Sequence, residues 1–144
     1  MTSSLVRRIL AVTGFAMFAS LSVAQAQLEE SFKFTTTFPF TVGNATLPAG
    51  SYTITPDEDA PAAFCIIEGK GVKMFFEIRS AETAQAPAKS EAVFTRFGQG
   101  YVLKNVWVEG SAEGIETTVA EPERHHIKRG GATSQEHVPA ANAP

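Results

Sequence analysis

Apolar and polar residues alternate strictly along residues 32–42. One face carries four phenylalanines, Thr36 and Val42, whereas the other face is mostly threonine with Lys33 and Pro39. A period of two with aromatic residues on one side predicts a half-buried β-strand. Pro39 has no N–H group to donate to a strand ladder, so we expect the strand to lie at an edge, bulge or bend there. Such a break would let one long strand serve two sheets.

Two β-hairpins are predicted further along the chain. Their strands are expected at residues 63–68, 72–78, 91–97 and 101–109. The hairpins turn at Gly69-Lys70-Gly71 and at Gly98-Gln99-Gly100, which are glycine-containing loops of the hairpin type. The second hairpin is apolar on both faces, which predicts that it is central or is covered on its second side.

Two connecting segments complete the predicted β-region. The sequence LPAG at residues 47–50 has Pro and Gly where a type I turn would close a hairpin with a bulge. Residues 80–88 are small, polar and Pro-containing, which is typical of a loop crossing the domain. Together these patterns predict one all-β domain within residues 27–110. It would be a small antiparallel barrel or a two-sheet sandwich of about six to eight strands.

The pattern changes after residue 110. Residues 121–130 have Pro122 in the first turn of a possible helix, cationic residues in its last turn and glycine at its end. These signals predict a short C-terminal helix within residues 111–130. Residues 131–144 are rich in Ala, Pro and polar residues, which predicts a disordered tail.

Residues 1–26 have the three parts of an export signal. Two arginines precede the apolar residues 9–23, a segment too short for a comfortable membrane span, and a small-x-small motif ends at Ala26. We expect cleavage between Ala26 and Gln27 and a mature protein in the periplasm or outside the cell. The alternative is an N-terminal anchor helix that is never cut.

Removal of the signal makes the chain more acidic. The full chain has 12 Lys and Arg against 15 Asp and Glu, and loss of the two signal arginines gives a formal charge of −5. No nucleic acid is expected as a partner, because its backbone requires a basic face. No stable membrane insertion of the mature chain is expected, because its predicted strands are short and its end is polar. Cys65 is the only cysteine, and its apolar neighbours favour a buried thiol over a reactive one.

The sequence contains no standard catalytic or cofactor motif. It has no G-x-S-x-G nucleophile elbow, no phosphate-binding glycine loop and no dinucleotide fingerprint. We therefore expect no catalytic residue and no cofactor. The three histidines, His125, His126 and His137, are weak candidates for a metal site, because adjacent histidines on a helix point about 100° apart. The alternative is that they are exposed polar residues.

The candidate recognition residues lie on the second hairpin. They are Arg96, Phe97, Tyr101 and Trp107. Trp, Tyr and Arg contribute most to binding energy when they are partly exposed. Tyr101 and Trp107 are six residues apart, so both are expected to project from one face. The alternative is that they fill the core beneath the predicted helix.

Three sequence stretches follow one another in a distinctive order. They are FPFTVG with LPAGSY at residues 38–52, VFTRFG with YVL at residues 93–103, and VWVEG at residues 106–110. Together they resemble a family of small exported bacterial proteins of the acidobacterial type. The resemblance implies a small β-barrel or sandwich closed by a helical tail, and it assigns no catalytic residue. Related sequences tend to have a longer charged helix, which Pro122 and the Gly130-Gly131 pair shorten here.

These observations predict an exported, non-enzymatic module that binds a partner. The partner would be a small apolar ligand inside a barrel or another envelope protein. One alternative is a structural or matrix-associated protein whose edge strands pair between copies. Another is an enzyme whose site assembles from scattered side chains. The length of the exposed edges and the presence of an interior cavity distinguish the first two.

Overall fold

A computed structural model describes residues 28, 30–118 and 134–141 of the chain. These residues form β-strands and no helix, which confirms the all-β fold class. The strands are β1 (Phe32–Thr36), β2 (Phe40–Val42), β3 (Ala45–Leu47), β4 (Gly50–Pro56), β5 (Phe64–Gly69), β6 (Val72–Glu82), β7 (Glu91–Phe97), β8 (Gly100–Trp107), β9 (Glu113–Thr117) and β10 (Ser134–Pro139). Within the described ranges, no helical segment has the length and apolarity needed to cross a membrane.

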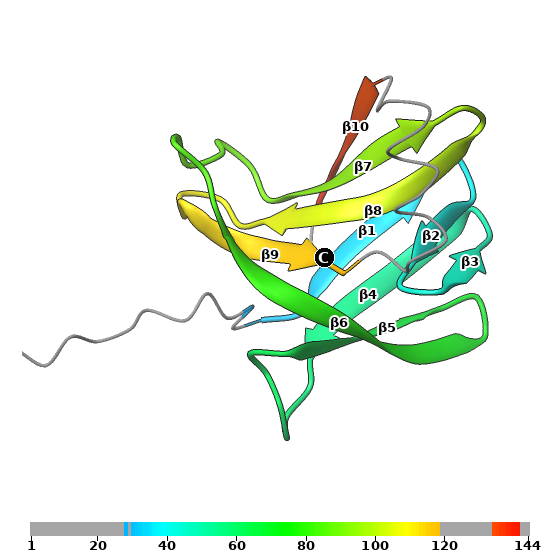
Figure 1. The fold of residues 1–144 in the computed structure, drawn as a ribbon, viewed down its shortest axis with the longest axis horizontal. Helices are drawn as coiled ribbons and strands as arrows, with labels where there is room; N and C mark the ends of the chain where they lie inside the picture. The colour runs from blue at the N-terminus through cyan, green and yellow to red at the C-terminus, as the bar shows by residue number, and fades with distance from the viewer. Residues whose placement is uncertain (1–27, 29, 119–133, 142–144) are drawn as a thin grey trace, which may run out of the picture.

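The strands form one mixed, open sheet. Its order is β1-β4-β5-β6-β9-β8-β2-β3, with β7 paired to β8 and β10 paired to β7. The long strand β6 joins its two parts, because residues 72–77 pair with β5 and residues 78–82 pair with β9. Figure 1 shows β6 running diagonally between these neighbours. The pairing of β2 with β8 is parallel, and an isolated bridge joins Phe34 of β1 to Ala140 just after β10.

The predicted break at Pro39 is confirmed. The alternating segment forms two strands, β1 and β2, separated by residues 37–39. β1 pairs with β4, whereas β2 pairs with β3 and meets β8. Because Pro39 cannot donate a ladder hydrogen bond, the chain leaves one ladder before it and enters another after it. One amphipathic segment therefore serves two parts of the sheet.

An aromatic cluster forms the centre of the core. Phe34 is 1% exposed, and its ring centroid lies 5.8–6.0 Å from those of four other rings. These rings belong to Phe32, Phe40, Tyr52 and Phe94. Tilted and edge-to-face pairs at such distances are favourable beyond the area that they bury. Since the rings come from β1, β2, β4 and β7, this cluster holds both parts of the sheet together.

The LPAG turn does not close a hairpin, contrary to the sequence-based expectation. β3 ends at Leu47 and β4 begins at Gly50, but β3 pairs with β2, whereas β4 pairs with β1 and β5. The hairpin turn lies instead before β3, where Gly43 adopts a φ of +60°. Pro48 belongs to a connection between the two parts of the sheet, and its carbonyl accepts a 2.6 Å hydrogen bond from the buried Tyr52 hydroxyl.

Two expectations about the C-terminal part are wrong. Residues 113–117, within the predicted helical segment, form β9 between β6 and β8. Residues 134–139, within the predicted disordered tail, form β10, and each of them pairs with β7. Both strands obtain their backbone hydrogen bonds from distant neighbours, so tertiary pairing overrides weak local preference. The predicted helix at residues 121–130 and the predicted export signal, with its expected cleavage after Ala26, lie outside the described residues.

Cys65 lies on β5 with its side chain fully buried, in agreement with the sequence-based interpretation. Burial, with a smaller contribution from the nearby charge of Asp57, raises the pKa of its thiol from 9.0 to about 12. The unfolded chain therefore loses this proton near pH 9, whereas the folded protein keeps it until about pH 12. The folded state binds more protons between these values, so the thiol lowers the free energy of unfolding as pH rises through that window.

We expect a Cys65→Ala variant to lack this contribution to the pH dependence. The variant should be less stable than wild type at neutral pH, because a buried side chain is shortened. The difference between the two proteins should shrink as pH rises from about 8 to about 10, since only the wild-type thiol opposes folding there. Urea denaturation at both pH values measures this, and an unchanged difference would contradict the assigned pKa shift.

Candidate functional site

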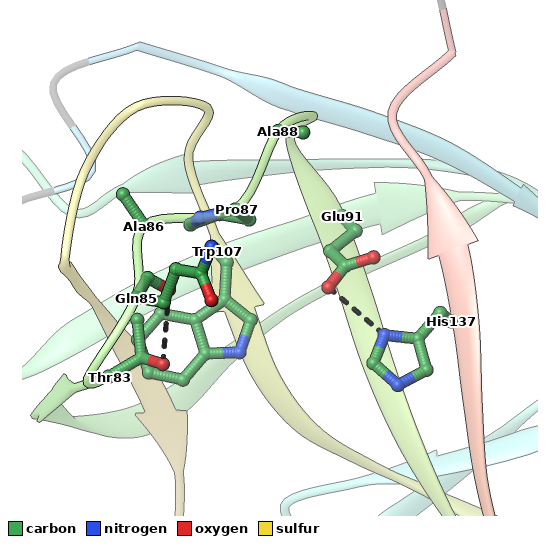
Figure 2. A pocket seen from close by; sticks show the side chains of 8 residues that line it. All are labelled: Thr83, Gln85, Ala86, Pro87, Ala88, Glu91, Trp107 and His137. Carbon is green, nitrogen blue, oxygen red and sulfur yellow. Dashed lines mark hydrogen bonds and ion pairs between the residues drawn. The ribbon is translucent and has the colours of Figure 1, made fainter.

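A groove opens beside residues 83–90, the loop between β6 and β7. Its volume is about 370 Å³. It is lined by Thr83, Gln85, Ala86, Pro87, Ala88, Glu91, Trp107 and His137. Figure 2 shows the loop curving above Trp107, with Glu91 and His137 on neighbouring strands to one side. The loop, β7, β8 and β10 therefore all contribute to it, although β10 is far from the others in sequence.

β8 turns Trp107 toward the groove and away from the core. The residue before it, Val106, is fully buried in the core. Ala92, which pairs with Val106 across the strands, is also fully buried there. Because successive strand residues point to opposite faces, Trp107 and its own partner Glu91 lie on the other face. Trp107 packs closely over β9, where a Cβ atom at Gly114 would lie 2.8 Å from its Cζ3 atom. Only the missing side chain at Gly114 leaves room for the indole.

Main-chain hydrogen bonds attach the loop to the turn between β8 and β9. The N–H group of Thr83 donates to the carbonyl of Ala112 at 2.9 Å. The N–H group of Gly110 donates to the carbonyl of Pro87 at 3.0 Å. These bonds fix the loop near both of its ends, so this side of the groove has a defined backbone position.

Glu91 and His137 form the polar end of the groove. The imidazole Nδ1 atom lies 3.0 Å from the carboxylate Oε1 atom. The register of β7 and β10 places His137 opposite Val93, which makes Glu91 its diagonal neighbour on the same face. The side chains of His137 and Glu91 are 52% and 25% exposed. Each also has a second atom, Nε2 and Oε2, that can form a hydrogen bond with a ligand.

The four predicted recognition residues do not form one cluster. Tyr101 lies at the opposite end of β8 from Trp107, where its ring stacks on that of Phe38 with a centroid separation of 4.0 Å. The guanidinium carbon of Arg96 lies 5.8 Å from the Tyr101 ring centroid, and its Nε atom donates a hydrogen bond to the Gly98 carbonyl. Phe97 is half-buried at the end of β7, beside the hairpin turn. Only Trp107 of the four lines the groove.

The expectation that Tyr101 and Trp107 share a face is wrong. A β-bulge shifts the register between Val93 and Phe94 and leaves Lys104 of β8 outside the cross-strand pairs. One extra residue reverses the alternation of side chains along the rest of the strand. Tyr101 therefore packs against the core, whereas Trp107 faces the groove.

The bulge also explains why sequence reasoning missed Glu91. Counting back from the turn in a regular hairpin places Glu91 opposite Val106, not opposite Trp107. The observed register pairs it with Trp107, and the long-range pairing with β10 adds His137. The weak sequence signal was a carboxylate at the start of a strand whose hairpin partner ends in tryptophan.

No metal site is apparent in the part of the chain that the structure describes. No three His, Cys, Asp or Glu side chains are grouped there in a way that could hold a metal ion. In the lining of the groove, Glu91 is the only other residue of these four types beside His137. His125 and His126 lie outside the described residues. Comparison with known proteins adds no assignment: the chain matches no protein-family model, and searches of curated proteins and of solved structures gave no match.

Proposed function

We propose that this protein is an exported, non-enzymatic binding module whose groove holds a ligand or a segment of an envelope protein. The observation that carries the proposal is Trp107, a partly buried indole in an open groove beside the hydrogen-bonding pair of Glu91 and His137. An aromatic surface with a few placed polar groups is typical of ligand sites. Tryptophan is also among the residues that contribute most to binding energy. The groove suits a ligand with one apolar face and a polar edge, such as a sugar ring or a short peptide.

The composition of the groove favours binding over catalysis. Glu91 is the one carboxylate among its lining residues, and hydrolysis by a carboxylate pair needs two. The Thr83 hydroxyl donates a 3.3 Å hydrogen bond to the main-chain carbonyl of Gln85. The partner of this hydroxyl is therefore a peptide oxygen and not a general base. An activated hydroxyl nucleophile requires such a base.

The packing of the core supports a surface site in place of an interior one. Phe34, Phe40 and Phe94 are each at most 1% exposed, and their ring centroids lie 5.1–5.9 Å apart. An apolar ligand inside the fold would have to displace these rings. Self-assembly through strand edges has weaker support, because the edge strand β3 has only three residues and the edge strands β1 and β10 approach each other at the Phe34–Ala140 bridge.

We also infer that the sheet wraps into a small barrel, or into a two-sheet sandwich joined by β6. The support is the contact between β1 and the segment after β10, which lie at opposite ends of the path of paired strands. Besides the Phe34–Ala140 bridge, the N–H group of Ala141 donates a 2.7 Å hydrogen bond to the Lys33 carbonyl. This contact would also steady β10, and with it His137, at the groove.

Trp107 is the only tryptophan of the chain, so its fluorescence reports directly on the groove. We expect a ligand from a panel of soluble oligosaccharides and short peptides to change this emission on titration. The Glu91→Gln variant should bind that ligand about tenfold to 100-fold more weakly, because a hydrogen bond to a charged group is lost. Glu58→Gln, at an exposed carboxylate between β4 and β5, is the matched control and should bind like wild type.

Native mass spectrometry of the protein from the exported fraction provides a second measurement. A chain beginning at Gln27 supports export, and an adduct present in wild type but lost from Trp107→Ala supports the groove as the binding site. An adduct that survives in Trp107→Ala would contradict the assignment of the groove. The absence of any fluorescence response across the panel of oligosaccharides and peptides would contradict the ligand classes proposed.

A further inference from the structure

An exposed apolar patch lies on the outer face of β5 and β6. Phe75 is 59% exposed and Phe64 is 40% exposed, whereas the residues that follow them, Phe76 and Cys65, point into the core. Phe75 pairs across the strands with Ile66, the next residue of β5 on the same face as Phe64. Directly opposite residues on one face of neighbouring strands are close together, and diagonal neighbours are within reach of aromatic side chains. Phe64, Ile66 and Phe75 therefore form one surface, which we call the Phe75 patch.

Opposite charges flank this patch along β6. Lys73 lies two residues before Phe75 and Glu77 two residues after it, so all three side chains share a face. Lys73 also lies 3.6 Å from Glu68, but their side chains are 62% and 64% exposed. An ion pair so exposed contributes little to the stability of a fold. The charges next to the patch are thus available to a partner.

We infer that the Phe75 patch is the interface of a two-fold symmetric homodimer. A two-fold axis that lies between the two faces, beside Phe75 and perpendicular to β6, brings the two phenylalanines together and places Lys73 of each copy opposite Glu77 of the other. The patch is complementary to itself in both charge and apolar character, as an interface between identical surfaces must be. Two sheets can pack face to face in this way, about 10 Å apart.

A second copy explains the pattern better than an unrelated partner. Lys73 and Glu77 are equally spaced about Phe75, so a second copy that packs in the reverse direction meets both charges with opposite ones. The patch lies on β5 and the first half of β6, whereas the groove is built from β7, β8, β10 and a loop. The dimer therefore leaves the groove open, and its test is independent of the proposed ligand site.

Charge reversal tests the pairing of Lys73 with Glu77. Sedimentation velocity on the exported chain should show a concentration-dependent dimer for wild type. Lys73→Glu and Glu77→Lys should each weaken dimerisation about tenfold or more, because two attractive contacts become repulsive. The double variant should recover dimerisation, because the acidic residue then stands at position 73 and the basic residue at position 77, and the two attract each other across the interface as before. Glu58→Lys is the control, and unchanged Trp107 emission shows that each variant is folded.

Phe75→Ser should shift the protein to monomer at concentrations where wild type is dimeric. Several results would overturn the inference. These are a wild-type monomer at about 100 µM, single reversals that leave the dimer intact, or a double variant that fails to recover it. A monomeric wild type that sediments with phosphatidylglycerol vesicles would instead assign the patch to a membrane surface, and would equally reject the dimer.

Discussion

Phe34→Ala is expected to lower the free energy of unfolding by about 3–5 kcal/mol, the range for removing a buried aromatic ring. Its ring contacts four other aromatic rings from β1, β2, β4 and β7, so the cavity would open where both parts of the sheet meet. Domains of this size are stable by about 5–15 kcal/mol in total, so much of the native stability would be lost. Urea denaturation followed by Trp107 fluorescence measures the change.

Phe75→Ala is the matched control for that experiment. The same atoms are removed, but the side chain is 59% exposed, so little core packing is lost. At concentrations too low for association its effect should stay below about 1 kcal/mol. Similar losses from the two variants would contradict the core placed around Phe34.

Gly114→Ala should destabilise the protein by about 1–3 kcal/mol, as expected for overpacking a well-packed site. The added Cβ atom would lie 2.6 Å from the Val106 carbonyl oxygen and 2.8 Å from Cζ3 of Trp107, both too close for an unaltered structure. Since Val106 is part of the β8 backbone, the indole has to move. We therefore expect Trp107 emission to shift to the red and ligand binding in the groove to weaken.

Gly100→Ala controls for the change of residue type. A Cβ atom at Gly100 would meet only the Phe97 carbonyl oxygen, at 3.6 Å, which is ordinary van der Waals contact. This variant should leave the Trp107 emission unchanged and should alter the free energy of unfolding by no more than about 0.5 kcal/mol. An unshifted Trp107 spectrum in Gly114→Ala would show that the indole does not rest on β9.

The parts of the fold that were predicted are those with a local signal, either alternating side chains along a strand or a glycine-containing turn between two apolar segments. Residues 32–42 carried the pattern of β1 and β2, including the change of ladder at Pro39, and both hairpins appeared at nearly their predicted positions. β10 carried no such pattern, because five of its six residues are exposed and only Val138 is buried. What holds it is the open edge of β7, which no local sequence pattern reveals.

The candidate site also depends on strand pairing that no local sequence pattern reveals. Trp107 was predicted as a candidate recognition residue from its chemical type, but the face of β8 to which it points depends on whether that strand is regular. The bulge at Lys104 reversed that direction, and neither Lys104 nor its ion pair with Glu116 has a sequence signature. Glu91 and His137 come together only through the pairing of β7 with β10, strands far apart in the sequence.

The pairing of β7 with β10 also bears on how the protein is made. A polypeptide leaves the ribosome or a translocation pore with its N-terminal part first, so the β7–β8 hairpin emerges well before β10. During that interval one edge of β7 presents unpaired N–H and C=O groups that other chains can bind. Incompletely folded chains are most prone to aggregate in such states. The interval between release of Phe97 and release of Ser134 is thus when a chaperone that covers strand edges would protect this protein most.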